Sequence, residues 1–219
     1  MDLDRYTRSR RSLHGLAEGL LSGPQYLTSG TIRMRVIDGA IATVAAPDVR
    51  YLNNSLVIDG RSIDVTGSFG ELASAAGLQW SVPSHYSDHS GITADDIADI
   101  DPADGESIIS WFTLGRDAME SMWPDTTPVL WPEHFDLGIS VAEVNYGISP
   151  GDDFHAAPYA YVGPWAFADW TDKDPFWNAP FGVVRSAAEL ENSEAITNFF
   201  TVARSHIKDS SHPHDPVAQ

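Results

Sequence analysis

Two side chains that can act as ligands, His134 and Asp136, stand two residues apart in the segment 131–136. The alternation of apolar residues from Phe135 to Val141 predicts a strand, and a period of two places His134 and Asp136 on the same face of it. An imidazole beside a carboxylate could bind a metal, or act as a general base with its orienting carboxylate. The simpler interpretation, which we favour, is a buried hydrogen-bonded pair that anchors the strand.

A metal site would need a third ligand, and the sequence offers two places for it. His155 follows a loop rich in turn residues at 148–153. If the strands on either side of that loop pair as a hairpin, His155 lies at the opposite end from His134, about ten residues or roughly 30 Å away. The same hairpin would bring His134 and Asp136 closer to three aspartates, which are Asp169, Asp172 and Asp174. Asp172 is therefore the weak third candidate, and we expect no cofactor.

The segment 159–181 is unusually rich in aromatic residues. Its rings belong to Tyr159, Tyr161, Trp165, Phe167, Trp170, Phe176, Trp177 and Phe181. Such rings could line a ligand cavity together with a few polar groups, or they could cover one open side of the sheet, which we favour. If the segment binds a ligand, we expect Tyr159, Tyr161, Trp165 and Trp177 to contribute.

Other patterns exclude several function classes. The cluster His85, Asp88 and His89 lacks the glutamate of the zinc-protease motif and is flanked by Pro83 and Gly91, so we expect a solvated loop. The sequence contains no nucleophile elbow, no phosphate-binding glycine loop and no dinucleotide motif.

The composition limits the partners. The chain has 219 residues, no cysteine and a net charge of -18, so disulfides and thiol chemistry are excluded and nucleic acid would be repelled. No apolar run is long enough to span a bilayer, so we expect no membrane partner. The sequence does not indicate an oligomeric state.

Helical and strand periodicities divide the chain into two series of elements. The first series has an amphipathic helix around 13–21, hairpins at 31–45 and 56–66, and a short helix at 69–77. An acidic connecting loop at 81–106 ends in the start of a helix at Asp101-Pro102, and that helix continues to about residue 123. The second series continues with strands at 135–141, 157–163 and 181–185 and a closing helix at 187–208.

Strands that come in hairpins, with helices kept apart from them, predict an α+β fold with antiparallel sheet, and two similar halves are conceivable. We expect one compact α+β domain over residues 1–208, with a subdivision conceivable near 81–106. The last residues, 209–219, carry two prolines and almost nothing apolar, which predicts a disordered tail.

Four segments also carry a family resemblance. They are Leu130 to Asp136, Asn145 to Asp152, Pro158 to Trp165, and Trp177 to Ala179. Over roughly residues 130–182 the chain resembles an uncharacterised family of actinobacterial hypothetical proteins. The resemblance implies a cytoplasmic bacterial protein and carries over no catalytic residue.

Two functional hypotheses follow. The first is a protein that binds a small molecule or a protein partner through the aromatic segment 159–181 and the polar strand face 134–142. The alternative is a metal-assisted enzyme, of the hydrolase kind, centred on His134 and Asp136. A purely structural or oligomeric role is a third and weaker possibility.

Overall fold

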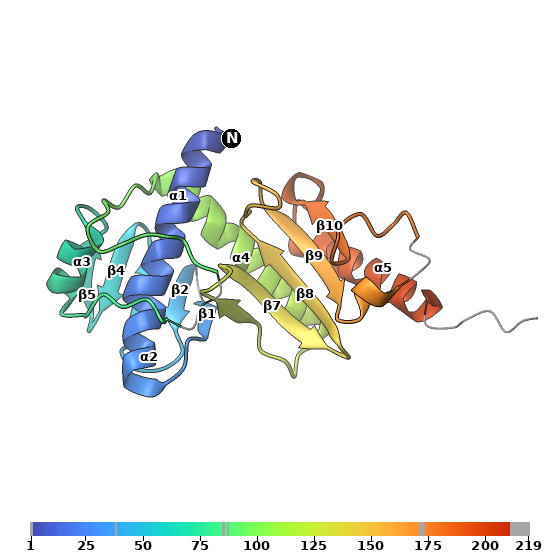
Figure 1. Cartoon of the computed structure of the whole chain (residues 1–219), viewed down its shortest axis with the longest axis horizontal. Coiled ribbons are helices and arrows are strands. Elements are labelled where there is room, and N and C mark those ends of the chain that lie inside the picture. The colour runs from blue at the N-terminus through green and yellow to red at the C-terminus, as the bar shows by residue number, and fades with distance from the viewer. Residues whose placement is uncertain (1, 38, 85, 87, 171–173, 211–219) are drawn as a thin grey trace, which may run out of the picture.

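The protein folds as an α+β structure around one antiparallel sheet, as the sequence predicted. The computed structural model describes residues 2–37, 39–84, 86, 88–170 and 174–210. The sheet has ten strands in the order β10-β9-β8-β7-β6-β1-β2-β3-β4-β5. Every neighbouring pair is antiparallel. Figure 1 shows the sheet running across the whole molecule with helices packed against it.

The first half begins with a long run of helix and continues as a five-stranded meander. Its elements are α1 (Leu3–Leu16), the π-helical segment η1 (Ala17–Ser22), α2 (Gly23–Ser29), β1 (Met34–Ile37), β2 (Ala40–Thr43), β3 (Val49–Leu52), β4 (Ser55–Ile58), β5 (Arg61–Asp64) and α3 (Phe69–Ala76). Both predicted hairpins and the short helix are present. Gly77 ends α3 in the left-handed conformation that glycine tolerates.

The second half repeats this plan. Its elements are α4 (Pro102–Met122), β6 (Val129–Trp131), β7 (Asp136–Val141), β8 (Val144–Ser149), β9 (Tyr159–Pro164), η2 (Phe167–Asp169), β10 (Val183–Ser186), η3 (Ala187–Glu189) and α5 (Ser193–Ser210). Each half is therefore helix, meander, helix, and the two meanders join where Met34 of β1 pairs with Leu130 of β6. The predicted tail lies outside the described residues from 211 onward, and residues 209 and 210 belong to α5.

Helix α4 starts where the sequence placed it. The Asp101 side chain accepts hydrogen bonds from the backbone N–H groups of Ala103 and Asp104, and Pro102 occupies the first turn. The buried Asp104 carboxylate then accepts hydrogen bonds from Arg5 Nε at 2.9 Å and Ser9 Oγ at 3.0 Å. These bonds tie the start of α4 to α1. The guanidinium of Arg5 lowers the pKa of Asp104 below its usual range.

Two predictions about strands were wrong. Strands β3, β6 and β8 were not predicted, and β8 lies between β7 and β9, which we expected to be neighbours. His134 is not part of a strand: it lies in the turn 132–135 between β6 and β7, and β7 begins only at Asp136. Phe135 has a φ of 52°, so the chain reverses there and does not extend.

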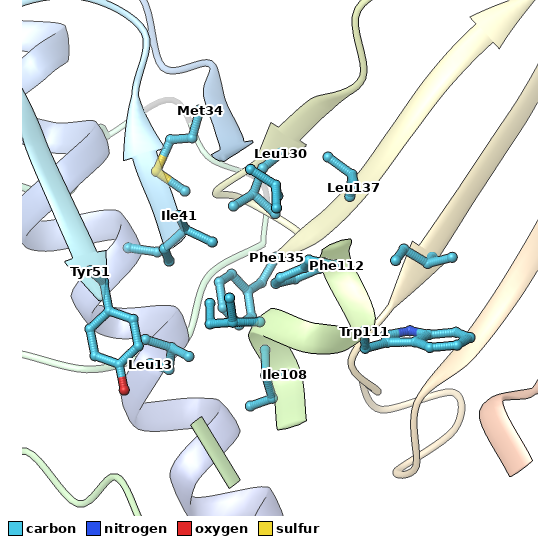
Figure 2. Close-up of a cluster of buried hydrophobic side chains, with 14 of the residues drawn as sticks. Leu13, Met34, Ile41, Tyr51, Ile108, Trp111, Phe112, Leu130, Phe135 and Leu137 are labelled. Carbon is cyan, nitrogen blue, oxygen red and sulfur yellow. The ribbon is translucent and has the colours of Figure 1, made fainter. Parts of the chain in front are cut away.

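The hydrophobic core is continuous across both halves. Figure 2 shows side chains from both halves converging in one cluster, among them Leu13 of α1, Ile41 of β2, Phe112 of α4 and Leu130 of β6. Phe135 turns into this cluster from its positive-φ position and meets Phe112 edge-on at 5.3 Å between ring centroids. Among the described residues, no helix has both the length and the apolar character needed to cross a bilayer.

Candidate ligand-binding site

Strands β7, β8 and β9 present two different faces. The residues Leu137, Tyr146, Ile148 and Val162 are buried, and Tyr146 packs against Trp123 at the C-terminal end of α4 and against Phe200 of α5. The alternate residues lie on the opposite face, which we call the open face; they are Asp136, Gly138, Ser140, Asn145, Gly147, Ser149, Tyr159, Tyr161 and Gly163. In Figure 1, α4 and α5 lie behind these three strands, so the open face is turned toward the viewer.

Two glycines make room for the ring of Tyr161 on this face. Gly138, Gly147 and Tyr161 are paired in one row across β7, β8 and β9. A Cβ atom on Gly147 would lie 2.4 Å from Cζ of Tyr161, and one on Gly138 would lie 3.3 Å from the Tyr161 hydroxyl oxygen. The ring therefore crosses β8 over Gly147, and its hydroxyl group reaches β7.

The Tyr161 hydroxyl donates a short hydrogen bond to Oδ2 of Asp136. The other carboxyl oxygen, Oδ1, is buried and has no hydrogen-bond partner among the described residues. Burial raises the pKa of Asp136, although the hydrogen bond from Tyr161 and the nearby His134 oppose that shift. Burial also raises the pKa of the Tyr161 hydroxyl. The pair is thus a half-buried phenol–carboxyl unit, in which burial disfavours the charge on Asp136 and the Tyr161 hydroxyl partly offsets that cost.

A second tyrosine–aspartate pair lies beside the first. Tyr159 donates to Oδ2 of Asp152 at 2.5 Å, and burial raises the pKa of Tyr159 above its usual range. The other oxygen of Asp152 accepts hydrogen bonds from the backbone N–H groups of Phe154 and His155, both at 2.9 Å. Asp152 therefore holds both its own loop and the Tyr159 hydroxyl group in position.

Two adjoining depressions occupy this region. The smaller has a volume of about 170 Å³ and is lined by His134, Asp136, Ser149, Asp152, Tyr159, Tyr161 and Phe181. The larger has a volume of about 500 Å³, and its lining includes Arg33, Trp131, Gly138, Ser140 and Asn145. Both share His134, Asp136 and Tyr161. The phenol–carboxyl unit therefore lies where the two depressions meet.

His134 and Asp136 line the same two depressions, but they do not share one face of a strand as predicted. His134 reaches both depressions from the turn, with 57% of its side chain exposed, and its Nδ1 lies 3.8 Å from Oδ2 of Asp88. The structure describes no hydrogen bond between His134 and Asp136, so the buried anchoring pair that we favoured is not what the turn contains.

The predicted geometry of the acidic neighbours was wrong. Because β8 intervenes, β9 runs in the same direction as β7, and the loop before β9 lies at the same end of the sheet as His134. The acid near Asp136 is consequently Asp152. Asp174 instead pairs with His206 of α5 at 3.6 Å, and Asp172 lies outside the described residues. Among the described residues, no group of three or more His, Asp or Glu side chains is arranged to hold a metal ion.

The predicted aromatic segment divides between two roles. Tyr159, Tyr161 and Phe181 line the smaller depression. Trp165 is 64% exposed and donates from Nε1 to Oδ1 of Asn145, so it is an exposed ring toward the other end of the open face. Trp177 is buried against Phe167, Trp170 and Phe176 and belongs to the core.

The turn that carries His134 is supported by helix α1. His14 stacks on Phe135 at 5.2 Å and contacts the carbonyl oxygen of Pro132 at 2.7 Å from Nε2, which therefore carries the proton. Burial lowers the pKa of His14 to about 4, so the ring is neutral at pH 7.

A buried acid lies one helical turn after His14. Glu18, in the π-helical segment, is 1% exposed, and its Oε2 accepts hydrogen bonds from the N–H and hydroxyl groups of Ser90. Burial raises the pKa of Glu18 to about 7. These contacts hold the loop around Ser90 against η1, next to Asp88, the partner of His134.

Sequence reasoning missed Ser149, Asp152 and Trp131 as lining residues. The sequence did carry a signal for Asp152. In an Asx turn an aspartate side chain accepts a hydrogen bond from the backbone N–H two residues later, and Phe154 stands at that position. No signal marked Ser149 or Trp131, because their place at the depressions depends on the unpredicted strand β8 and on the pairing of β6 with β7. Comparison with known proteins adds no relative: no family model, no curated protein and no solved structure matches this chain.

Proposed function

We propose that the protein binds a small molecule on the open face of β7, β8 and β9, with the Asp136–Tyr161 unit at the centre of the site. The observation that carries this proposal is the Asp136 oxygen that is buried without a hydrogen-bond partner beside two depressions. An unsatisfied buried carboxyl oxygen costs about 1–3 kcal/mol of folding free energy. Unlike Glu18, which lies under the loop held by Ser90, Asp136 adjoins space in which a ligand could offset that cost.

The shape of the face supports a small-molecule ligand over a protein partner. The depressions are concave and combine rings with a few converging polar groups, which is typical of small-molecule sites. Gly138 and Gly147 leave the space in which the Tyr161 ring lies. The lining residues come from separate strands and loops, so the fold as a whole holds them in place.

The metal-assisted enzyme centred on His134 and Asp136 stays a prediction that no observation on the described residues favours. A cytoplasmic location and membership of the actinobacterial family also stay predictions. Binding without a stated reaction is the function that these contacts support best.

Intrinsic fluorescence offers a direct test, because Trp131 lines the larger depression. We expect at least one member of a broad metabolite library to change the tryptophan emission of the native chain in a saturable way. Tyr161→Phe and Asp136→Asn should weaken that response at least tenfold, since each removes one partner of the central unit. Asp153→Asn is the matched control, because Asp153 is an exposed neighbour of Asp152. Silence of the native chain across the library would refute the proposal.

A further inference from the structure

We infer that the ligand of this site is a small organic cation, whose ammonium or guanidinium group enters the smaller depression between Asp136 and Asp152. This inference rests on the proposed function and adds the chemical class of the ligand. Three features of the depression carry it: the hydrogen-bonding capacity of its polar groups, its rings and its charge.

The polar groups of the smaller depression call for a ligand that donates hydrogen bonds. The hydroxyl protons of Tyr159 and Tyr161 are already donated to Asp152 and Asp136. Ser149 Oγ accepts a hydrogen bond from the N–H of Gly151. What these groups still offer is mainly acceptor capacity on carboxylate and hydroxyl oxygens. An N–H-rich group matches that need, whereas a ligand carboxylate or phosphate does not.

Three aromatic rings, those of Tyr159, Tyr161 and Phe181, line the smaller depression. Tyr161 and Phe181 meet nearly at right angles, 6.2 Å between centroids, and Tyr159 lies 6.3 Å from Tyr161. Phe154 supports two of these rings through edge-on contacts, at 6.0 Å from Tyr159 and 5.1 Å from Phe181 between centroids. Aromatic faces attract cations through their quadrupoles, so these rings favour an ammonium group over a neutral one.

The charge of the site and of the whole molecule favours the same class. The lining of the smaller depression contains two carboxyl groups and, as its basic group, only the imidazole of His134 among the described residues. The larger depression adds one cation, Arg33, and one acid, Glu133. A net charge of -18 raises the local concentration of cations around the protein and repels anions. The volume of about 170 Å³ suits a single head group, and the larger depression beyond Asp136 offers space for the rest of the ligand.

The test compares ligands of the same shape and different charge by isothermal titration calorimetry. Benzylammonium and agmatine are the cationic probes with N–H donors, benzyl alcohol is the neutral isostere of benzylammonium, and glucose represents neutral polyols. We expect a cation to bind at least tenfold more tightly than the neutral isostere. Asp136→Asn and Asp152→Asn should each weaken cation binding at least tenfold, whereas Asp153→Asn should change it less than twofold. Near-ultraviolet circular dichroism checks that each variant keeps its fold, and Tyr161→Phe provides a second variant that keeps both carboxyl groups.

The outcomes separate the two proposals. If the isostere or glucose binds as tightly as the cations, the inferred ligand class is wrong and the binding site stands. If neither cation binds while another class from the metabolite library does, the inference is again wrong and the proposed function survives. If neither the cations nor any library member binds, both are wrong.

Discussion

At the scale of single residues, two buried carboxyl groups define the chemistry of this chain. Asp136 and Glu18 each have one oxygen that is buried and has no hydrogen-bond partner among the described residues. Asp136 lines two depressions, whereas Glu18 lies under the loop held by Ser90. A buried carboxyl group therefore belongs to a candidate ligand site at Asp136 and to the attachment of a loop at Glu18.

Glu18 and His14 should give opposite pH dependences of stability. The pKa of Glu18 rises from 4.5 to about 7 on folding, so its stabilising contribution is present below pH 4.5 and is lost as the pH rises to 7. The pKa of His14 falls from 6.5 to about 4, so its contribution is present above pH 6.5 and is lost as the pH falls to 4. In the native chain the two slopes largely cancel between pH 4.5 and 6.5.

Single substitutions should separate these slopes. In Glu18→Gln the free energy of unfolding should rise with pH across this window, by up to about 3 kcal/mol relative to the native profile. In His14→Gln it should fall with pH by a similar amount. Urea denaturation at several pH values between 4 and 7.5 measures both. Because His14 Nε2 lies 3.5 Å from Glu18 Oε1, the double variant Glu18→Gln/His14→Gln measures how far each group shifts the other. Parallel profiles for the two variants would show that neither pKa is shifted as described.

At the scale of elements, turn chemistry decided what the sequence could predict. Hairpins with an Asp-Gly turn and helices with an N-cap or a C-terminal glycine were placed correctly. Strand β8 was missed because the turn before it uses Ala142 and Glu143 at φ values of 51° and 63°, residues that give no turn signal. The turn after β3 uses Asn53 and Asn54 at positive φ, a signal that was present and not used. Missing β8 reversed the direction of β9, so Asp136 was assigned the wrong acidic neighbours.

The packing of Tyr161 across β8 can be tested at Gly147. In Gly147→Ala the new methyl group would lie within 3 Å of the Tyr161 ring, so the ring must move and its hydroxyl loses Asp136. We expect a loss of about 1–3 kcal/mol in the free energy of unfolding, together with weaker ligand binding. Because the clash needs the ring, the double variant with Tyr161→Ala should cost less than the sum of the two single changes. Asp153→Asn, an exposed change outside both depressions, is the control, and simple additivity would refute the packing.

At the scale of the whole molecule, two similar halves share one sheet and one core. The sheet is continuous only through the short contact at Met34 and Leu130, whereas the core joins helices α1 and α4 with strands of both halves. Helix α1 also reaches the second half directly, since Tyr6 donates to the carbonyl oxygen of Pro150 and Arg10 to that of Ala156. The loop that holds Asp152 thus depends on a helix of the first half, which a sequence read element by element did not reveal.

Leu130 tests whether the halves unfold together. It is fully buried at the junction of β6 with β1, so Leu130→Ala should cost about 2–5 kcal/mol through lost burial and a cavity. If the shared core makes the molecule one cooperative unit, hydrogen exchange should show the same loss of protection in β3 and β4 as in β7 and β8. Ile63→Ala, at the edge strand β5, is the control and should affect mainly its own hairpin. Loss of protection confined to the second half would mean that the halves are separate folding units, and the single domain predicted over residues 1–208 would then be wrong.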